Sequence, residues 1–218
     1  MFIMDMHTHT AAYSPCSITD PVEHIRRAAA VGLDGICITE HDRPWLSWEW
    51  QALQRDARGL NIILLPGQEI RCHDAEGRTK GDFLIFGPEI IIERPLTPQA
   101  LIGLIHERRG IVIAAHPYRG DMRFLGAGDL LYELDQDGIE VYHPHHTRSG
   151  LDKAKAAAEK LDRAATGASD AHRLEEIGTL GTIFPEPVAN LEDLVRQIKA
   201  KKTTPVSMLP GWPEEEWF

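Results

Sequence analysis

Short, continuous apolar runs alternate with longer amphipathic stretches along the chain. The runs show no regular polar alternation, which is typical of strands that are covered on both faces of a parallel sheet. They occupy residues 2–4, 35–39, 62–65, 83–86, 111–114, 138–141, 164–166 and 181–184. Helical patterns lie over residues 20–31, 45–58, 97–109, 151–161 and 191–201. This alternation predicts an α/β fold with a parallel sheet.

Local signals define several boundaries. Asp20-Pro21-Val22-Glu23 and Thr97-Pro98-Gln99 each combine a capping side chain with a proline in the first turn, and so predict helix starts. The polar residues 76–81 predict a hairpin-like turn. The tail has no regular pattern, and we expect its aromatic residues to pack on the body or to mediate self-association; they are Trp212, Trp217 and Phe218.

Length and composition narrow the fold and the class of protein. Eight full strand–helix pairs usually need about 250 residues, whereas this chain has 218 residues, 43% of them hydrophobic. We therefore expect one domain over residues 1–218, folded as a distorted (β/α)7 barrel that is similar to a TIM barrel. The formal charge of −10 argues against stable binding of duplex nucleic acid.

The cysteines and the apolar runs indicate the compartment. Cys16, Cys37 and Cys72 are odd in number and widely spaced, so they suggest neither a disulfide framework nor a zinc ribbon. No apolar run approaches the ~20 residues that span a bilayer, and the N-terminus shows no basic-then-apolar leader pattern. We expect a cytoplasmic protein that makes no membrane contact.

Polar residues follow the apolar runs, beginning with Asp5-Met6-His7-Thr8-His9. Alternate side chains of a strand share a face, so His7 and His9 should point at one place. In parallel α/β folds the carboxyl ends of the strands meet at one mouth. The candidate ligands collected there are His7, His9, His41, Glu69, His116, His143, Asp170 and His172. Imidazoles mixed with carboxylates suit zinc, manganese or iron, and the set is large enough for two or three divalent ions.

Five motifs in this order resemble the PHP (polymerase and histidinol phosphatase) family of metal-dependent phosphoesterases. They are His-x-His at 7–9, Ile-Thr-Glu-His-Asp at 38–42, Gly-Gln-Glu at 67–69, Ala-His-Pro at 115–117 and Ser-Asp-Ala-His at 169–172. The resemblance covers residues 5 to about 201 and implies a (β/α)7 barrel with up to three metals. It places His7, His9, Glu69 and Asp170 at the first metal, Glu69 and His116 at the second, and His41 and His172 at the third.

The chain departs from the family pattern at three places. Glu40 stands where relatives have aspartate, although His41 is retained. The loop after His9 carries Tyr13-Ser14-Pro15-Cys16 where many relatives have an aspartate or histidine. The third metal is therefore expected to be weak or absent unless Cys16 substitutes. Relatives also often carry a histidine at the position of Asp82, so either Asp82 or His143 completes the second site.

Other polar residues receive structural or substrate-binding interpretations. His24 and His106 lie within predicted helices and are expected at the surface, His73 at the rim, and His145 and His146 in a solvated loop. Arginines that closely follow ligand motifs are candidates for phosphate contact, because a guanidinium fork matches phosphate oxygens. They are Arg71, Arg119, Arg148 and Arg173.

These observations predict a metal-dependent phosphoesterase. Its substrate would be a small phosphomonoester, such as histidinol phosphate or a nucleotide, or an oligonucleotide end, attacked by a metal-bound hydroxide. Asp170, His172 and Arg119 are the candidate catalytic residues. Two alternatives remain open: an amidohydrolase-type metal hydrolase, whose barrel also begins with His-x-His, and a non-catalytic metal-binding module.

Overall fold

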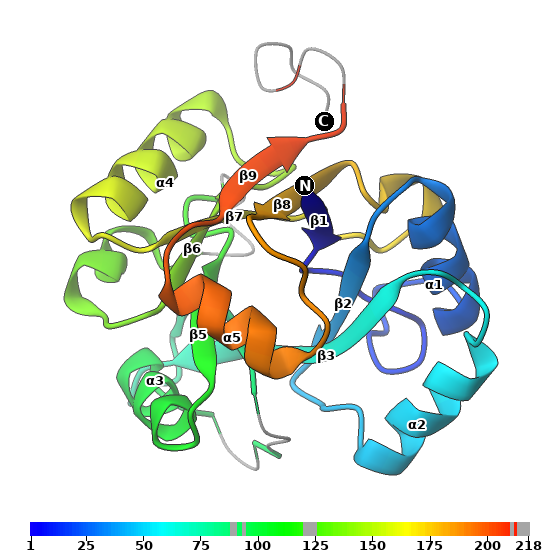
Figure 1. Cartoon of the computed structure of the whole chain (residues 1–218). Helices are drawn as coiled ribbons and strands as arrows, with labels where there is room; N and C mark the ends of the chain where they lie inside the picture. Colours follow the sequence, from blue (N-terminus) through cyan, green and yellow to red (C-terminus); the bar gives the residue numbers. More distant parts are fainter. Residues whose placement is uncertain (88–90, 93–94, 120–125, 210–211, 213–218) are drawn as a thin grey trace.

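The computed structural model describes residues 1–87, 91–92, 95–119, 126–209 and 212. Its strands form one nine-stranded sheet in the order β7-β6-β5-β4-β3-β2-β1-β8-β9. The strands are β1 (Phe2–Asp5), β2 (Gly35–His41), β3 (Ile63–His73), β4 (Thr79–Phe86), β5 (Ile111–Ala115), β6 (Gly138–Tyr142), β7 (Ala164–Gly167), β8 (Leu180–Phe184) and β9 (Thr204–Ser207). Figure 1 shows them curving around a common centre, with helices on the outside. The expected barrel is confirmed.

The sheet is less uniformly parallel than expected. Strands β1, β2 and β3 pair in parallel, as do β5, β6 and β7, but β4 is antiparallel to both of its neighbours. The predicted turn is the reason, because residues 74–78 are too few for a helical crossover and produce a hairpin. Strands β8 and β9 are also antiparallel, to β1 and β8 respectively.

The helices begin close to the predicted positions. They are α1 (Pro21–Ala30), α2 (Ser47–Asp56), α3 (Pro98–Glu107), α4 (Arg148–Lys160) and α5 (Leu191–Lys199), together with short 3-10 helices η1 (Gly128–Glu133) and η2 (Leu174–Glu176). Asp20 and Thr97 accept hydrogen bonds from the first-turn amides of α1 and α3, as their sequence signatures predicted. None of the helices in the described ranges is long and apolar enough to cross a bilayer.

Apolar side chains fill one end of the barrel. Met4, Leu65 and Ile113 pack there with Leu194 and Ile198 of α5, and Figure 1 shows α5 lying across this end. Side chains two positions apart share a face of a strand. The inward-facing positions therefore change from apolar to polar residues along each strand, toward the other end of the barrel. The opposite end of the barrel is therefore polar.

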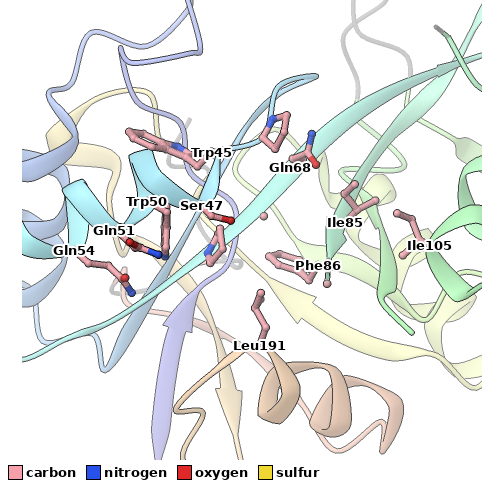
Figure 2. Close-up of a pocket in the computed structure, with 14 residues that line it drawn as sticks. Trp45, Ser47, Trp50, Gln51, Gln54, Gln68, Ile85, Phe86, Ile105 and Leu191 are labelled. Carbon is pink, nitrogen blue, oxygen red and sulfur yellow. The ribbon is translucent and has the colours of Figure 1, made fainter. Parts of the chain in front are cut away.

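The hairpin between β3 and β4 has a second effect, since no helix connects these two strands. A cavity of about 330 Å³ lies beside them, lined by residues that include Trp45, Trp50, Gln68, Phe86 and Leu191 (Figure 2). In the tail, Trp212 packs edge-on against Tyr142, with ring centroids 4.6 Å apart. The expectation for Trp217 and Phe218 lies outside the described residues.

Candidate metal centre

The polar end of the barrel opens into a cavity of about 620 Å³. Its walls come from the loops and strand ends at this mouth. The lining residues are Pro15, Cys16, His41, Asp42, Glu69, Arg71, Asp82, His116, Arg119, Pro144, His145, Ser169, Asp170, His172, Glu176 and Thr179. His7, His9 and His143 lie buried beside these residues. All eight candidate ligands are thus brought to one end of the fold.

Four buried side chains surround one point. The Nε2 atoms of His7 and His9 lie 3.0 Å apart, and they lie 3.3 and 3.2 Å from Oδ1 of Asp170. Each is also 3.5 Å from a carboxylate oxygen of Glu69. Ligand atoms bound at about 2 Å from one ion are themselves about 3 Å apart. The residues present therefore fit a divalent cation with mixed nitrogen and oxygen ligands.

Outer contacts decide which imidazole nitrogens face this point. The Nδ1 atom of His7 lies 3.2 Å from Oε1 of Glu140, and Nδ1 of His9 lies 3.2 Å from Oγ of Ser14. Glu140 can only accept, and the Ser14 hydroxyl donates to Glu40, so both Nδ1 atoms carry the proton. Nε2 is then the nitrogen of each ring that would face an ion.

Glu40 also holds the loop that supports His9. Its buried carboxylate accepts hydrogen bonds from the Thr10 amide, at 3.2 Å, and from the hydroxyls of Thr10 and Ser14. Glu40, which stands where relatives have the shorter aspartate, thus holds this loop in place. Glu140 and Glu40 were not predicted as site residues. The signal available for Glu140 was a charged residue inside an otherwise apolar strand.

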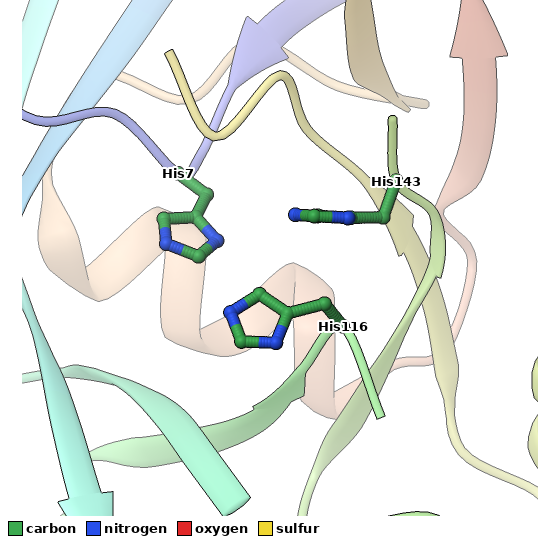
Figure 3. Close-up of side chains that lie close together, drawn as sticks. All are labelled: His7, His116 and His143. Atoms are coloured by element: carbon green, nitrogen blue, oxygen red, sulfur yellow. The ribbon is translucent and has the colours of Figure 1, made fainter. Parts of the chain in front are cut away.

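Three imidazoles approach one another from different strands. Figure 3 shows His7, after β1, with His116, after β5, and His143, after β6. The Nε2 atom of His116 lies 2.9 Å from Oε1 of Glu69, and Nε2 of His143 lies 3.2 Å from Oδ2 of Asp170. The His145 amide donates to Nδ1 of His143 at 3.1 Å. The His143 proton therefore resides on Nε2 and is donated to Asp170.

Asp82, the other candidate at the second site, is held by Arg71. The guanidinium makes two bonds to the carboxylate, of 2.8 and 2.9 Å. Asp82 also belongs to a group with Glu69 and His116 whose ligand atoms all lie within 4.8 Å of one another. Because β4 is antiparallel, Asp82 lies in the first half of its strand yet pairs with Ala115 at the end of β5, close to the mouth.

His41 and His172 form the outer part of the centre with Cys16. The Nδ1 atom of His41 lies 2.7 Å from Glu69, and its Nε2 lies 3.2 Å from Sγ of Cys16. Burial alone would raise the pKa of the Cys16 thiol, but its hydrogen bonds with His172 and His41 outweigh burial and lower the pKa to about 6.

The carboxylates of Glu69 and Asp170 are ionised although they are buried in the barrel. Burial would raise the pKa of Glu69 and of Asp170, yet the neighbouring His7 charge and hydrogen bonds from histidines hold both values well below the usual range. Burial lowers the pKa of His9 to about 4. At neutral pH the centre therefore offers ionised carboxylates and a neutral imidazole, which are the forms that bind cations.

Two ligand candidates have unusual backbone conformations. His116 and Asp170 have φ of 30° and 50°, each just beyond a barrel strand. Non-glycine residues rarely adopt positive φ, and such conformations concentrate at functional sites. Here they turn the two side chains toward the common point.

The four candidate arginines occupy different surroundings. Nη1 of Arg119 lies 3.7 Å from Oδ2 of Asp170, and its side chain is 17% exposed at the cavity wall. Arg71 also lines the cavity. Arg148, at the start of α4, and Arg173, before η2, are exposed and lie outside the described lining.

The surface assignment of His24 is wrong. It is completely buried in α1, with Nδ1 3.0 Å from the Thr19 hydroxyl, and burial lowers its pKa to about 3. The apolar face of this helix is wide enough to include position 24. The helical pattern does not reveal this, because histidine is a polar residue in an amphipathic pattern.

The remaining histidines are supporting residues. His145 is exposed on the cavity wall, whereas His146 is half-buried and bonds backbone atoms through both ring nitrogens, Nδ1 to Val141 O and Nε2 to Tyr118 N. His146 therefore fixes the loop that carries Arg119. His73 ends β3, and the half-buried His106 pairs with Asp137 at 2.8 Å.

Comparisons with known proteins identify the family. The PHP-associated family model (PHP_C) matches residues 149–203. The uncharacterized protein MJ1587 of Methanocaldococcus jannaschii is 31% identical over 157 residues, covering 67% of this chain and 84% of that protein. A two-domain protein from Bacteroides vulgatus, which contains a predicted PHP-like metal-dependent phosphoesterase, superposes with a TM-score of 0.73 at 16% identity. The chain belongs to the PHP family.

The structural likeness extends beyond proteins named for PHP. The superposition on the Bacteroides vulgatus protein covers 94% of this PHP chain and 64% of that chain. An amidohydrolase from Chromobacterium violaceum, with bound sulfate and no metal, gives a TM-score of 0.65 at 16% identity over 95% of this chain and 99% of its own. At these identities the superpositions establish the barrel fold.

Proposed function

We propose that this PHP protein is a metal-dependent phosphoesterase. The observation that carries the proposal is the group formed by His7, His9, Glu69 and Asp170, with ligand atoms 3.0–3.5 Å apart at the base of an open cavity. An arginine adjoins this group directly, through the contact of Arg119 with Asp170. Cation ligands and a phosphate-binding side chain thus share one mouth.

The donor set suits two or three zinc, manganese or iron ions. Such ions, when bound, supply a Lewis acid for the phosphoryl oxygens and lower the pKa of water. His7, His9, Glu69 and Asp170 would hold the first, Glu69 and His116 the second with Asp82 or His143, and His41 and His172 the third. Asp170 connects the cation ligands to the phosphate-binding arginine. Its Oδ1 atom faces His7 and His9, and its Oδ2 atom faces His143 and Arg119.

Arg119 is the residue that binds and orients the phosphate. Its planar fork can take two phosphate oxygens while it stays against Asp170. His146 and the bridge between residues 119 and 146 fix the backbone that presents it. Arg148 and Arg173, which are exposed beyond the cavity lining, would reach only the distal part of a larger substrate.

The size and charge of the site favour a small substrate. A cavity of about 620 Å³ accommodates a small phosphomonoester or the terminal nucleotide of an oligonucleotide. The net charge of −10 disfavours a long polyanion. We therefore infer a phosphomonoester, with an amino-alcohol phosphate or a nucleotide as the class to test first.

The experiment is phosphate release by protein that is stripped with a chelator and reloaded with manganese, zinc or iron. Asp170→Asn and His9→Ala should lower turnover of p-nitrophenyl phosphate more than about a hundredfold, because even outer contacts to ligands typically contribute 10–100-fold. His106→Gln, which changes a histidine outside the centre, is the matched control and should retain turnover. Wild-type rates in both site variants would remove the proposed site.

The amidohydrolase likeness defines the competing function. A barrel that begins with His-x-His and superposes on an amidohydrolase could hydrolyse cyclic amides. The same reloaded protein is therefore assayed against a panel of cyclic amides. Ring opening without phosphate release would replace the phosphoesterase proposal.

A further inference from the structure

Cys16 lies at the edge of the metal centre, next to two histidines. Its thiol is exposed, whereas Cys37 and Cys72 are buried in the core. Sγ is 3.2 Å from Nε2 of His41, and the thiol also hydrogen-bonds with His172. The sulfur atom thus contacts both imidazoles at the cavity wall.

The Nδ1 contacts of the two histidines leave Nε2 as the nitrogen available beside this sulfur. Nδ1 of His41 lies 2.7 Å from Oε2 of Glu69, and Nδ1 of His172 lies 2.7 Å from the carbonyl oxygen of Asp170. Both partners are acceptors, so each Nδ1 carries a proton and Nε2 is the nitrogen left for an ion. Metal-binding histidines show this pattern, with the distal nitrogen held by a carboxylate or a carbonyl.

The loop that carries Cys16 is fixed on both sides. Ser14 is buried and donates to Glu40. Ser17 is buried and donates to the carbonyl oxygens of His9 and His172, at 2.9 and 3.1 Å. The thiol is therefore accessible to solvent while its backbone is anchored to the strand ends that present the imidazoles.

We propose that Cys16, as a thiolate, binds one divalent ion together with His41 and His172, and that the sulfur makes this position select zinc over manganese. The protons held by the sulfur and by the two Nε2 atoms are released to solvent as the ion binds. Thiolate is a soft ligand that favours zinc, whereas manganese prefers oxygen ligands. This assignment rests on the proposed function, which supplies the first and second ions. It makes the third ion position chemically different from those two, because only the third has a sulfur ligand.

The first test is cobalt titration of the chelator-treated protein. A thiolate ligand produces a sulfur-to-cobalt charge-transfer band in the near ultraviolet, which imidazole and carboxylate ligands do not. The band should appear in the wild type, persist in the control Cys72→Ala and vanish in Cys16→Ser. A fully loaded wild type without the band, or a band that persists in Cys16→Ser, would overturn the proposal.

The second test uses the unequal exposure of the cysteines. In the folded protein a thiol reagent such as Ellman's reagent should modify one cysteine per chain, because the other two are buried. Stoichiometric zinc should slow this modification more than about tenfold, and manganese at the same concentration should not. Modification that is indifferent to zinc would overturn the ligand assignment, and equal protection by manganese would overturn the selectivity.

The two proposals fail in distinguishable ways. Phosphate release is measured on the same preparations, with cobalt, zinc and manganese. Cobalt binding and phosphate release without the charge-transfer band would remove only the Cys16 assignment. A charge-transfer band in protein that releases no phosphate from any tested ester would leave the thiolate site in place and remove the phosphoesterase function.

Discussion

At the residue scale, the centre depends on side chains that do not touch an ion themselves. Glu140 is completely buried and bonds both Nδ1 of His7 and the backbone amide of His116, at 3.2 and 2.7 Å. One carboxylate therefore orients ligand candidates from two strands. Such contacts typically contribute 10–100-fold to metal affinity.

Glu140→Ala should accordingly weaken zinc binding about 10–100-fold, measured by competition with a chromogenic chelator. Glu140→Gln keeps an oxygen that can accept from one of the two groups and should lose less. Zinc affinity is therefore expected to fall in the order wild type, Glu140→Gln, Glu140→Ala. Wild-type affinity in the alanine variant would show that Glu140 does not position His7.

The hydrogen bonds of His143 separate it from the other imidazoles. Because its Nδ1 accepts from the His145 amide, its Nε2 donates to Asp170 and has no lone pair for an ion. His143→Gln should therefore keep the number of ions bound per chain, whereas Asp82→Asn should lose one. The metal content of each variant after gel filtration decides whether Asp82 or His143 is the ligand. Loss of an ion in His143→Gln alone would show that His143 is the ligand.

Buried His24 should make stability depend on pH. Its folded pKa, about 3, lies below the usual value of 6.5, so as pH falls the unfolded state takes up the proton first. The contribution is fully present above about pH 6.5 and is lost as pH drops toward 3. Between pH 7 and pH 5 this effect lowers the free energy of unfolding by about 2 kcal/mol.

Urea unfolding with chelator present measures this effect without metal binding. The wild type should lose about 2 kcal/mol more between pH 7 and pH 5 than His24→Asn, which retains a polar atom near Thr19. Equal losses in both proteins would show that His24 titrates with an ordinary pKa in the folded state.

At the element scale, the β3–β4 hairpin is where sequence and structure differ most. The apolar pattern predicted a strand at 62–65 with Glu69 beyond it, but β3 runs from Ile63 to His73 and Glu69 lies inside it. The register places Glu69 opposite His41 on β2. Hydrophobicity could not predict this extension, because polar residues continue a strand wherever the barrel interior itself is polar.

Other elements show which signals are reliable. Capped helix starts at Pro21 and Pro98 were predicted because capping chemistry is local. Strand β9 and helix η1 were missed, since Thr204–Ser207 is short and contains a proline, and Gly128–Glu133 has no apolar period. The candidate ligands were found through their motifs, whereas Glu140 and Asp5 act through contacts that only the assembled barrel creates.

The hairpin also gives a matched pair of glycine variants. Gly77 and Gly81 both have positive φ, of 79° and 110°, but a Cβ at Gly77 meets nothing within 4 Å, whereas one at Gly81 lies 2.7 Å from the Ala127 backbone nitrogen. Gly77→Ala should lower the free energy of unfolding by about 1 kcal/mol, and Gly81→Ala by roughly 3 kcal/mol. Denaturant titration compares them, and equal losses would mean that the loop at Ala127 adapts.

At the scale of the whole molecule, Thr182 joins the two ends of the sheet. It is buried in β8, accepts from the Gly167 amide at 3.0 Å and donates to the Gly167 carbonyl at 2.8 Å. These bonds connect β8 to β7, which lie far apart in the strand order. Together with the Thr203 hydroxyl, which donates to the Ala165 carbonyl of β7 at 2.8 Å, Thr182 therefore closes the barrel where strand pairing is lacking.

Thr182→Val keeps the shape but leaves two buried backbone groups without their partner, and should lower the free energy of unfolding by about 2–4 kcal/mol. Thr182→Ser keeps the hydroxyl and should lose about 1 kcal/mol, the value of a methyl group. Denaturant titration measures both. A valine variant as stable as the serine variant would show that closure does not depend on these bonds.

The long reach of these contacts determines when the protein can acquire its ions. The Asp5–Ser169 hydrogen bonds join residues 164 positions apart, and β1 is paired on both sides, with β2 and with β8. Contacts between such distant positions form slowly, because the entropy of a long loop is lost before they contribute. During synthesis His7 and His9 must therefore wait for Asp170 to leave the ribosome, so metal loading follows synthesis of the whole segment between them.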